Sequence, residues 1–206
     1  MKINLIYYVF IFLFLILFTK IYWIKNSPPF GLYRLCYNCI LKYKTKYTSL
    51  NKKVCYENIS ILHDVLTKHN IFFWLSEGTA LGFRRNNDFI SHDDDVDISI
   101  YEKDLDKFLD IIPELQKHGF NYNGKCHNMP YFLSRKGMII DVDVVGDNLY
   151  CTANYSPCKE LKPYVQKFNK IKIRGKIFNI PTDKYFRKLY GDTWRISIRG
   201  KKPNKN

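Results

Sequence analysis

Acidic residues are scarce in this chain of 206 residues, which has 19 Asp and Glu against 33 Lys and Arg and a formal net charge of +14. The shortage is uneven, because nine acids and only two lysines lie between Asp88 and Asp110. No internal repeat is present, which excludes a solenoid. One Cys-x-x-Cys pair without a matching second pair argues against a four-cysteine zinc site, although six cysteines permit disulfides in an oxidising compartment. The basic remainder of the chain suits an anionic ligand, a lipid headgroup or nucleic acid.

A long apolar run stands at the start of the sequence. Residues 3–18 are apolar apart from Asn4, and a helix continued through Ile24 is about 33 Å long, enough to cross a bilayer. The run lacks the small residues of a signal-peptide cleavage site, so we expect an uncleaved anchor, with a cleavable signal peptide as the alternative. The expected organisation is a transmembrane signal-anchor over residues 1–25, a stem over 26–53, a catalytic domain over 54–200 and a basic tail over 201–206.

The acidic run from Asp93 to Asp97 leads directly into an apolar, alternating stretch. Side chains alternate across a strand, so Asp93, Asp95 and Asp97 are predicted to share one face. Three like charges at this spacing raise one another's pKa and destabilise a fold unless a divalent cation neutralises them. We therefore predict a site for Mg²⁺ (or Mn²⁺). A solvated acidic loop is the alternative.

A glycine-containing turn precedes the acidic run. Ile71–Leu75 is predicted to be a short buried strand, and Gly78 and Thr79 lie in the turn that leads from it into a helix. Gly78 permits close approach of a ligand, and the helix start offers N–H groups to an anion, so the turn is a candidate phosphate cradle. An ordinary helix N-cap is the alternative. Arg84 and Arg85 could clamp a diphosphate in two-point contact, although bare arginines are more often surface residues.

A second candidate strand, Met138–Val145, carries two carboxylates, Asp141 and Asp143, on one face. Buried strands seldom hold aspartates without a polar function. A carboxylate on a neighbouring strand would complete a metal site that orients phosphates and faces an incoming hydroxyl. An edge strand with one wet face is the alternative. His92, immediately before Asp93, is predicted to lie at the mouth of this site.

The remaining pattern predicts a small mixed α/β domain. Apolar residues at helical spacing indicate one amphipathic helix around Ile59–Leu66 and a second over Leu105–Leu115, which Gly119 ends. The order helix, strand, helix, strand, helix, strand, strand favours an α/β fold with a mixed sheet, and roughly 150 residues are ample for one core.

Three separated motifs together resemble one known family. Gly78-Thr79-Ala80-Leu81-Gly82 is followed by Arg85 and by Phe89-Ile90-Ser91-His92, then comes Ile140-Asp141, and then Tyr190-Gly191-Asp192-Thr193-Trp194-Arg195. In this order they resemble the LicD family, which includes fukutin and fukutin-related protein. Ser91 and His92 stand where that family usually has Pro-Trp, and Asp143 stands where an aromatic residue is often seen. The resemblance covers roughly residues 54–196.

The resemblance implies a nucleotidyltransferase-type fold that moves a phosphorylated alcohol, such as phosphocholine or ribitol phosphate, from a CDP-activated donor to a glycan hydroxyl. Asp95 and Asp97 would then hold Mg²⁺ together with Asp93, and Asp141 or Asp143 would accept the proton of the acceptor. Positioning and charge neutralisation dominate such phosphoryl transfer, and aspartates suit that work. The residues expected to contact substrate are Gly78, Thr79, Arg84, Arg85 and His92.

The resemblance also implies a type II membrane protein with its catalytic domain in the lumen of the Golgi or ER. The lysines that flank the apolar run lean slightly against that orientation, whereas sequons at Asn58 and Asn154 are compatible with it. Two other functions stay open. One is a nucleotidyltransferase acting on a small molecule or RNA, which the basic C-terminal part would suit but a membrane anchor argues against. The other is a non-catalytic membrane scaffold of the same fold.

Overall fold

The structure is a computed structural model that describes residues 50–125, 131–146 and 161–196, all within the unit Asn38–Asn206. In these three ranges no helix is both long enough and apolar enough to cross a membrane. The expected anchor over residues 1–25, most of the expected stem and the basic tail lie outside them. Cys55 is a buried free thiol. The other five cysteines lie outside the described ranges.

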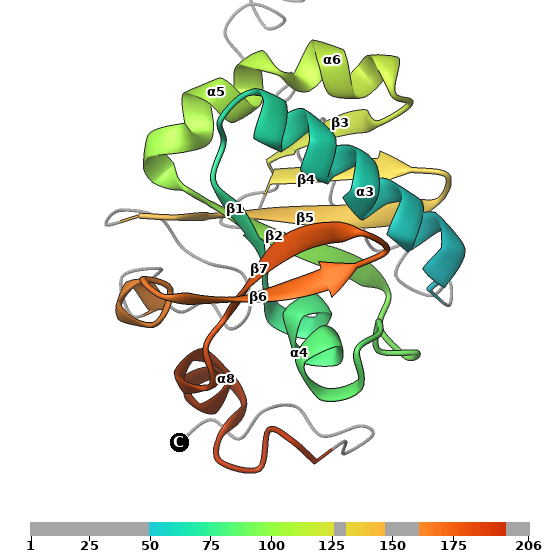
Figure 1. The fold of residues 1–206 in the computed structure, drawn as a ribbon. Coiled ribbons are helices and arrows are strands. Elements are labelled where there is room, and N and C mark those ends of the chain that lie inside the picture. Colours follow the sequence, from blue (N-terminus) through green and yellow to red (C-terminus); the bar gives the residue numbers. More distant parts are fainter. Residues whose placement is uncertain (1–49, 126–130, 147–160, 197–206) are drawn as a thin grey trace, which may run out of the picture. The chain divides into compact units, whose positions relative to one another are not determined.

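A five-stranded mixed sheet is the centre of the fold (Figure 1). Strands β2 and β5 run parallel, and the other neighbouring pairs are antiparallel, which confirms the expected α/β class with a mixed sheet. Both central strands are buried along most of their length. From one edge to the other the strands are β1 (Phe73–Leu75), β2 (Asp95–Tyr101), β5 (Met138–Val145), β4 (Tyr131–Arg135) and β3 (Asn121–Lys125).

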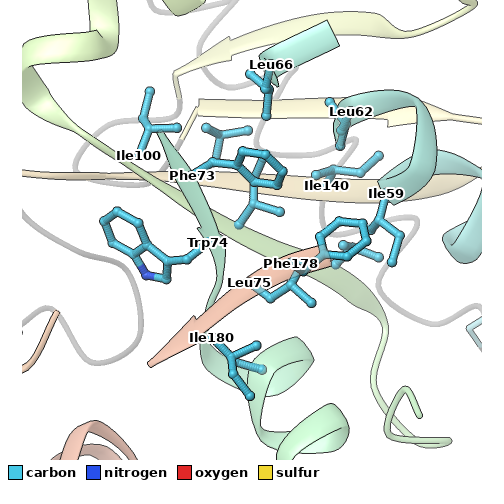
Figure 2. Packing of buried hydrophobic residues seen from close by; sticks show 14 of the residues in the cluster. Ile59, Leu62, Leu66, Phe73, Trp74, Leu75, Ile100, Ile140, Phe178 and Ile180 are labelled. Atoms are coloured by element: carbon cyan, nitrogen blue, oxygen red, sulfur yellow. The ribbon is translucent and has the colours of Figure 1, made fainter. Parts of the chain in front are cut away.

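Helix α3 (Lys52–Lys68) supplies a large part of the apolar core. The Asn51 side chain caps its first turn, because its Oδ1 accepts a hydrogen bond from the N–H of Val54 at 3.2 Å. The predicted apolar stripe is buried, and Ile59 and Leu62 lie over the sheet in the core (Figure 2). The spacing of apolar residues in this helix was therefore sufficient to identify its buried face.

The single helix predicted over Leu105–Leu115 is two short helices, α5 (Leu105–Asp110) and α6 (Ile112–Lys117). Pro113 lies in the first turn of α6, where its missing N–H costs nothing but where it cannot continue the hydrogen-bond ladder of α5. The chain therefore turns at Ile111. Gly119 follows α6 with a φ of 84°, in agreement with its predicted role as a stop.

The sequon at Asn58 is not presented to solvent in this domain. Asn58 is 0 % exposed, and its Oδ1 accepts a hydrogen bond from Nη1 of Arg135 at 2.9 Å. Arg135 also bonds Glu57, so these side chains join α3 to β4. Asn58 therefore has a structural role and gives no support for a lumenal orientation. Asn154 lies outside the described residues.

A β-hairpin extends the core beside β1. Its strands are β6 (Phe168–Ile173) and β7 (Lys176–Pro181), and Nδ2 of Asn179 donates a hydrogen bond to the carbonyl of Phe73 at 2.7 Å. Phe178 points from β7 into the core next to Ile59 (Figure 2). The hairpin leads into α8 (Asp183–Tyr190), and β1 leads into α4 (Glu77–Asn86). These last two helices carry residues of the candidate site.

Candidate active site

Side-chain alternation gives the sheet one apolar and one polar face. Asp95, Asp97 and Ser99 of β2 share the polar face, because they lie two residues apart along one strand. On the parallel neighbour β5, Asp141 stands opposite Asp97 and Asp143 stands opposite Ser99. The polar face therefore collects carboxylates from both central strands, as the two acidic sequence motifs predicted.

Asp93, Asp95 and Asp97 each direct a carboxylate oxygen toward one point, and these three oxygens lie within 4.8 Å of one another. The strand begins only at Asp95. The expectation that all three share a strand face is therefore wrong for Asp93, which reaches the cluster from the preceding turn. That turn is closed by a hydrogen bond from the N–H of Asp93 to the carbonyl of Ile90 at 3.2 Å. Sequence alternation predicted that these three carboxylates lie together but did not predict the position of Asp93.

The electrostatics of this carboxylate cluster favour a cation. Burial raises the pKa of Asp93 to about 7, and the charges of Asp95 and Asp94 contribute to the rise. Burial also raises the pKa of Asp97 well above its usual value, and the charges of Asp95 and Glu77 raise it further. A bound divalent ion would reverse this penalty. Three carboxylates offer the oxygen ligands that Mg²⁺ and Mn²⁺ prefer, so the donor set fits the predicted metal.

The turn at the start of α4 holds the cluster in place. The N–H of Asp97 donates to Oγ1 of Thr79 at 2.8 Å, and the N–H of Thr79 donates back to Oδ2 of Asp97 at 3.3 Å. A Cβ added at Gly78 would lie 2.3 Å from Oδ2 of Asp93, so only a glycine lets that carboxylate lie where it does. Both residues of the predicted cradle thus contact the acidic cluster directly.

The two carboxylates of β5 occupy different surroundings. Asp141 is one of the charges that raise the pKa of Asp97, so it belongs to the neighbourhood of the carboxylate cluster. Asp143 lines a cavity further along the sheet. Both side chains are nearly fully buried. The sequence left open which of them is functional, and the structure gives them separate positions.

A small cavity beside the cluster has room for about one water molecule and is partly open to solvent. Polar and aromatic side chains from several elements line one side of it: Trp74 of β1, Glu77 of α4, Ser99 of β2, Asp143 of β5 and Tyr185 of α8. The apolar side chains that line it are Val145, Leu161 and Val165. Trp74 was predicted only as part of a buried strand, and neither Glu77 nor Tyr185 was predicted to be a site residue. One signal for Trp74 was available: the alternation of a three-residue strand directs it away from Phe73 and Leu75 (Figure 2).

Glu77 has an uncommon backbone conformation, with a φ of 43° in the left-handed region. Its N–H donates a hydrogen bond to the hydroxyl of Tyr185 at 3.3 Å, which joins α4 to α8. Burial raises the pKa of Tyr185 well above its usual range, and the Glu77 carboxylate contributes to the rise. The Tyr185 hydroxyl is therefore neutral and keeps a proton to donate.

Two of the other predicted substrate contacts, Arg84 and Arg85, bond to groups of the protein itself. Nε of Arg84 donates to Oδ1 of Asp183 at 2.9 Å, and Nη1 of Arg85 donates to the carbonyl of Trp194 at 3.4 Å. Both arginines thus connect α4 to α8 and the segment that follows it. His92 is exposed in the turn before the cluster.

A cluster of carboxylates that can hold a divalent metal suits phosphoryl transfer, because a bound metal neutralises the charge on phosphate oxygens. The family model described as LicD/FKTN/FKRP, nucleotidyltransferase domain, matches residues 70–190. The chain belongs to the LicD family, as the motifs predicted.

Individual similar proteins add little about function. An uncharacterized protein of Rickettsia typhi is 32% identical over 112 residues, which cover 48% of this chain and 35% of that protein. An uncharacterized protein of Rickettsia prowazekii is 36% identical over 77 residues, which cover 36% of this chain and 29% of that protein. The chain thus spans about a third of the length of these relatives. The solution structure of the antibiotic-resistance factor ANT(2'')-Ia is similar to this chain with a TM-score of 0.46 and 14% sequence identity, and the match covers 64% of this chain and 66% of that one.

Proposed function

We propose that this chain is a membrane-anchored transferase that moves a phosphorylated alcohol from a CDP-activated donor to a glycan hydroxyl. The observation that carries the proposal is the convergence of Asp93, Asp95 and Asp97 at one point, with Asp141 on the adjacent parallel strand. Membership of the LicD family supports the general class of transferase. The membrane anchor over residues 1–25 stays part of the proposal on the apolar sequence alone, and the lumenal location stays part of it on the family resemblance.

The proposed division of labour follows the positions of the carboxylates. Asp93, Asp95 and Asp97 would hold Mg²⁺ or Mn²⁺, which neutralises and orients the two donor phosphates when bound. Thr79 fixes the backbone and carboxylate of Asp97 through its two hydrogen bonds. Asp141, beside Asp97 in the register, is the carboxylate we assign to accept the proton of the attacking hydroxyl. Each aspartate then acts mainly by position and charge.

A binding panel on the full chain tests this proposal. The melting temperature would be measured with Mg²⁺ or Mn²⁺ and, in turn, CDP-choline, CDP-ribitol, CDP-glycerol, CTP, ATP and UTP. A ligand at 100 times its Kd that binds only the native state adds about 2.7 kcal/mol of stability. We expect a metal-dependent shift with a CDP-alcohol, and its loss in Asp95→Asn.

Asp110→Asn is the matched control, because Asp110 is an exposed carboxylate on α5 outside the cluster. That variant should keep the full shift. A shift with nucleoside triphosphates alone would instead favour a nucleotidyltransferase acting on a small molecule or RNA. A folded sample that responds to none of these ligands would favour the non-catalytic scaffold.

A further inference from the structure

The loop between α4 and β2, residues 87–94, carries Asp93, the one of the three clustered aspartates that does not lie on a strand. Asp95 and Asp97 belong to β2, where they stand in register with residues of β5. Asp93 precedes the strand, so its position depends on the contacts that fix the loop. Those contacts are therefore part of the geometry of the proposed metal site.

Asp88, near the start of this loop, contacts α3 through both of its carboxylate oxygens. Its Oδ2 accepts a hydrogen bond from Nζ of Lys52 at 2.6 Å, and its Oδ1 accepts one from the hydroxyl of Tyr56 at 2.7 Å. The N–H of Phe89 also donates to Oδ1, at 2.8 Å. Burial and the hydrogen bond to Asp88 raise the pKa of Tyr56 to about 12, so its hydroxyl keeps the proton that it donates.

The ring of Tyr56 is held on several sides. Its centroid lies 5.0 Å from that of Phe89 in the loop and 6.1 Å from that of Phe83 in α4, in both cases edge to face. The guanidinium carbon of Arg174, in the turn between β6 and β7, lies 3.8 Å from the same centroid. Tyr56 therefore connects α3, α4, the loop and the hairpin, and these contacts fix the direction of its hydroxyl.

The contacts continue along the loop from Asp88 to Asp93. The loop lies directly on α4, since a Cβ added at Gly82 would be 2.6 Å from the carbonyl oxygen of Asp88 and 3.0 Å from the backbone nitrogen of Ile90. The carbonyl of Ile90 accepts the hydrogen bond from the N–H of Asp93 at 3.2 Å. Closely packed segments transmit a displacement because they have no free space to absorb it. A shift of Asp88 should therefore reach the carboxylate of Asp93.

The exposure of the ion pair between Lys52 and Asp88 indicates that its main effect is not on stability. Their side chains are 38% and 37% exposed, and exposed ion pairs contribute little to the stability of a fold. Contacts that orient metal ligands, by contrast, change metal affinity by about 10- to 100-fold.

We propose that Asp88 and Tyr56 are positioning residues for the metal site, which hold the loop so that Asp93 meets the cation together with Asp95 and Asp97. The inference deepens the proposed function and rests on it for the presence of the metal. The alternative is a set of contacts that only stabilises the fold. The two accounts differ in whether the effect on metal binding passes through Asp93.

The affinity of the full chain for Mn²⁺, measured by electron paramagnetic resonance, tests this inference. Asp88→Ala removes both contacts with α3 and should reduce Mn²⁺ affinity by about tenfold or more. Tyr56→Phe removes only the hydroxyl and keeps the ring among its neighbours, so it should cause a smaller loss in the same direction. Asp88→Asn keeps an oxygen that can accept from Tyr56 and should restore most of the affinity.

Glu57→Ala is the matched control. Glu57 is the next residue of α3, and its carboxylate also joins this helix to another element, because it accepts a hydrogen bond from Nη2 of Arg135 in β4 at 2.7 Å. These contacts do not include the loop. The variant should lower the melting temperature and leave Mn²⁺ affinity unchanged.

A double-mutant cycle with Asp93→Asn asks whether the effect passes through Asp93. Once residue 93 no longer supplies a carboxylate, a displaced loop has little left to disturb. Asp88→Ala should then change the remaining Mn²⁺ affinity by less than about twofold, which is within the usual error of additivity. If Asp88→Ala does not fold, Tyr56→Phe takes its place in the cycle.

The outcomes separate this inference from the proposed function. A wild-type protein that binds no Mn²⁺, or whose binding survives Asp95→Asn, overturns the proposed metal site and this inference with it. Binding that Asp95→Asn abolishes but that folded Asp88→Ala and Tyr56→Phe proteins retain in full overturns this inference alone. A loss of the same size with and without Asp93→Asn also overturns it, because the contacts of Asp88 would then act on the fold and not through Asp93.

Discussion

The substitution Gly78→Ala should weaken metal binding without unfolding the domain. The added Cβ would lie 2.3 Å from Oδ2 of Asp93 and 3.4 Å from Oδ2 of Asp97. Asp93 must therefore retreat by about 1 Å to reach ordinary van der Waals contact. Disturbing a group that orients metal ligands costs about 10- to 100-fold in metal affinity, and a 1 Å misplacement can cost about 100-fold in rate. We expect Mn²⁺ affinity, measured by electron paramagnetic resonance or calorimetry, to fall by at least about tenfold.

The fold should tolerate this change, because Gly78 lies in the first turn of α4 and is not among the glycines with positive φ. Gly137→Ala is the opposite control. Nothing lies within 4 Å of a Cβ at Gly137, but its φ is 78°, so the variant should lose about 1–2 kcal/mol of stability and keep Mn²⁺ binding. A folded Gly78→Ala protein with wild-type Mn²⁺ affinity would refute the argument that Asp93 needs its close contact with Gly78.

Two further predictions concern stability. Leu62→Ala removes a fully buried side chain and should lower the free energy of unfolding by about 2–5 kcal/mol in urea denaturation, whereas Ile177→Ala, at a side chain 51 % exposed, should change it by less than about 0.5 kcal/mol. Equal losses would contradict the assigned core. Hydrogen bonds from Arg135 and Lys136 lower the pKa of Glu57 to about 2. Glu57→Gln should therefore reduce the melting temperature at pH 7, and the difference from wild type should shrink as the pH falls from about 4.5 to about 2; a pH-independent difference would oppose this account.

The parts of the fold that depend on local periodicity could be predicted from the sequence. The apolar stripe of α3 and the alternation of β2 are local patterns, and both elements form where expected. The break at Ile111 was missed because apolar spacing continues across Pro113. The residues around a proline do not by themselves show whether it begins a second helix or lies inside the first one.

The candidate site could be predicted only where its residues are close in sequence. Thr79 and Asp97 are 18 residues apart, and their two hydrogen bonds lie within one helix-turn-strand unit. Arg84 resembled a substrate clamp because its partner, Asp183, is 99 residues away and no local pattern connects the two. Tyr185 was missed for the same reason, since its contact with Glu77 spans 108 residues.

Glu77 shows how backbone strain adds information that neither motif nor burial supplies. A non-glycine residue in the left-handed region costs about 1–2 kcal/mol, and a glycine at this position would adopt the same φ at no steric cost. The backbone N–H that bonds Tyr185 would be present in glycine as well, so that bond does not explain the side chain. What only the glutamate supplies is a carboxylate, and its charge adds to the burial that raises the pKa of Asp97 in the cluster. Strain of this kind clusters at functional sites. The conformational cost at Glu77 therefore makes the turn that begins α4, beside the carboxylate cluster, a place to test for a functional role.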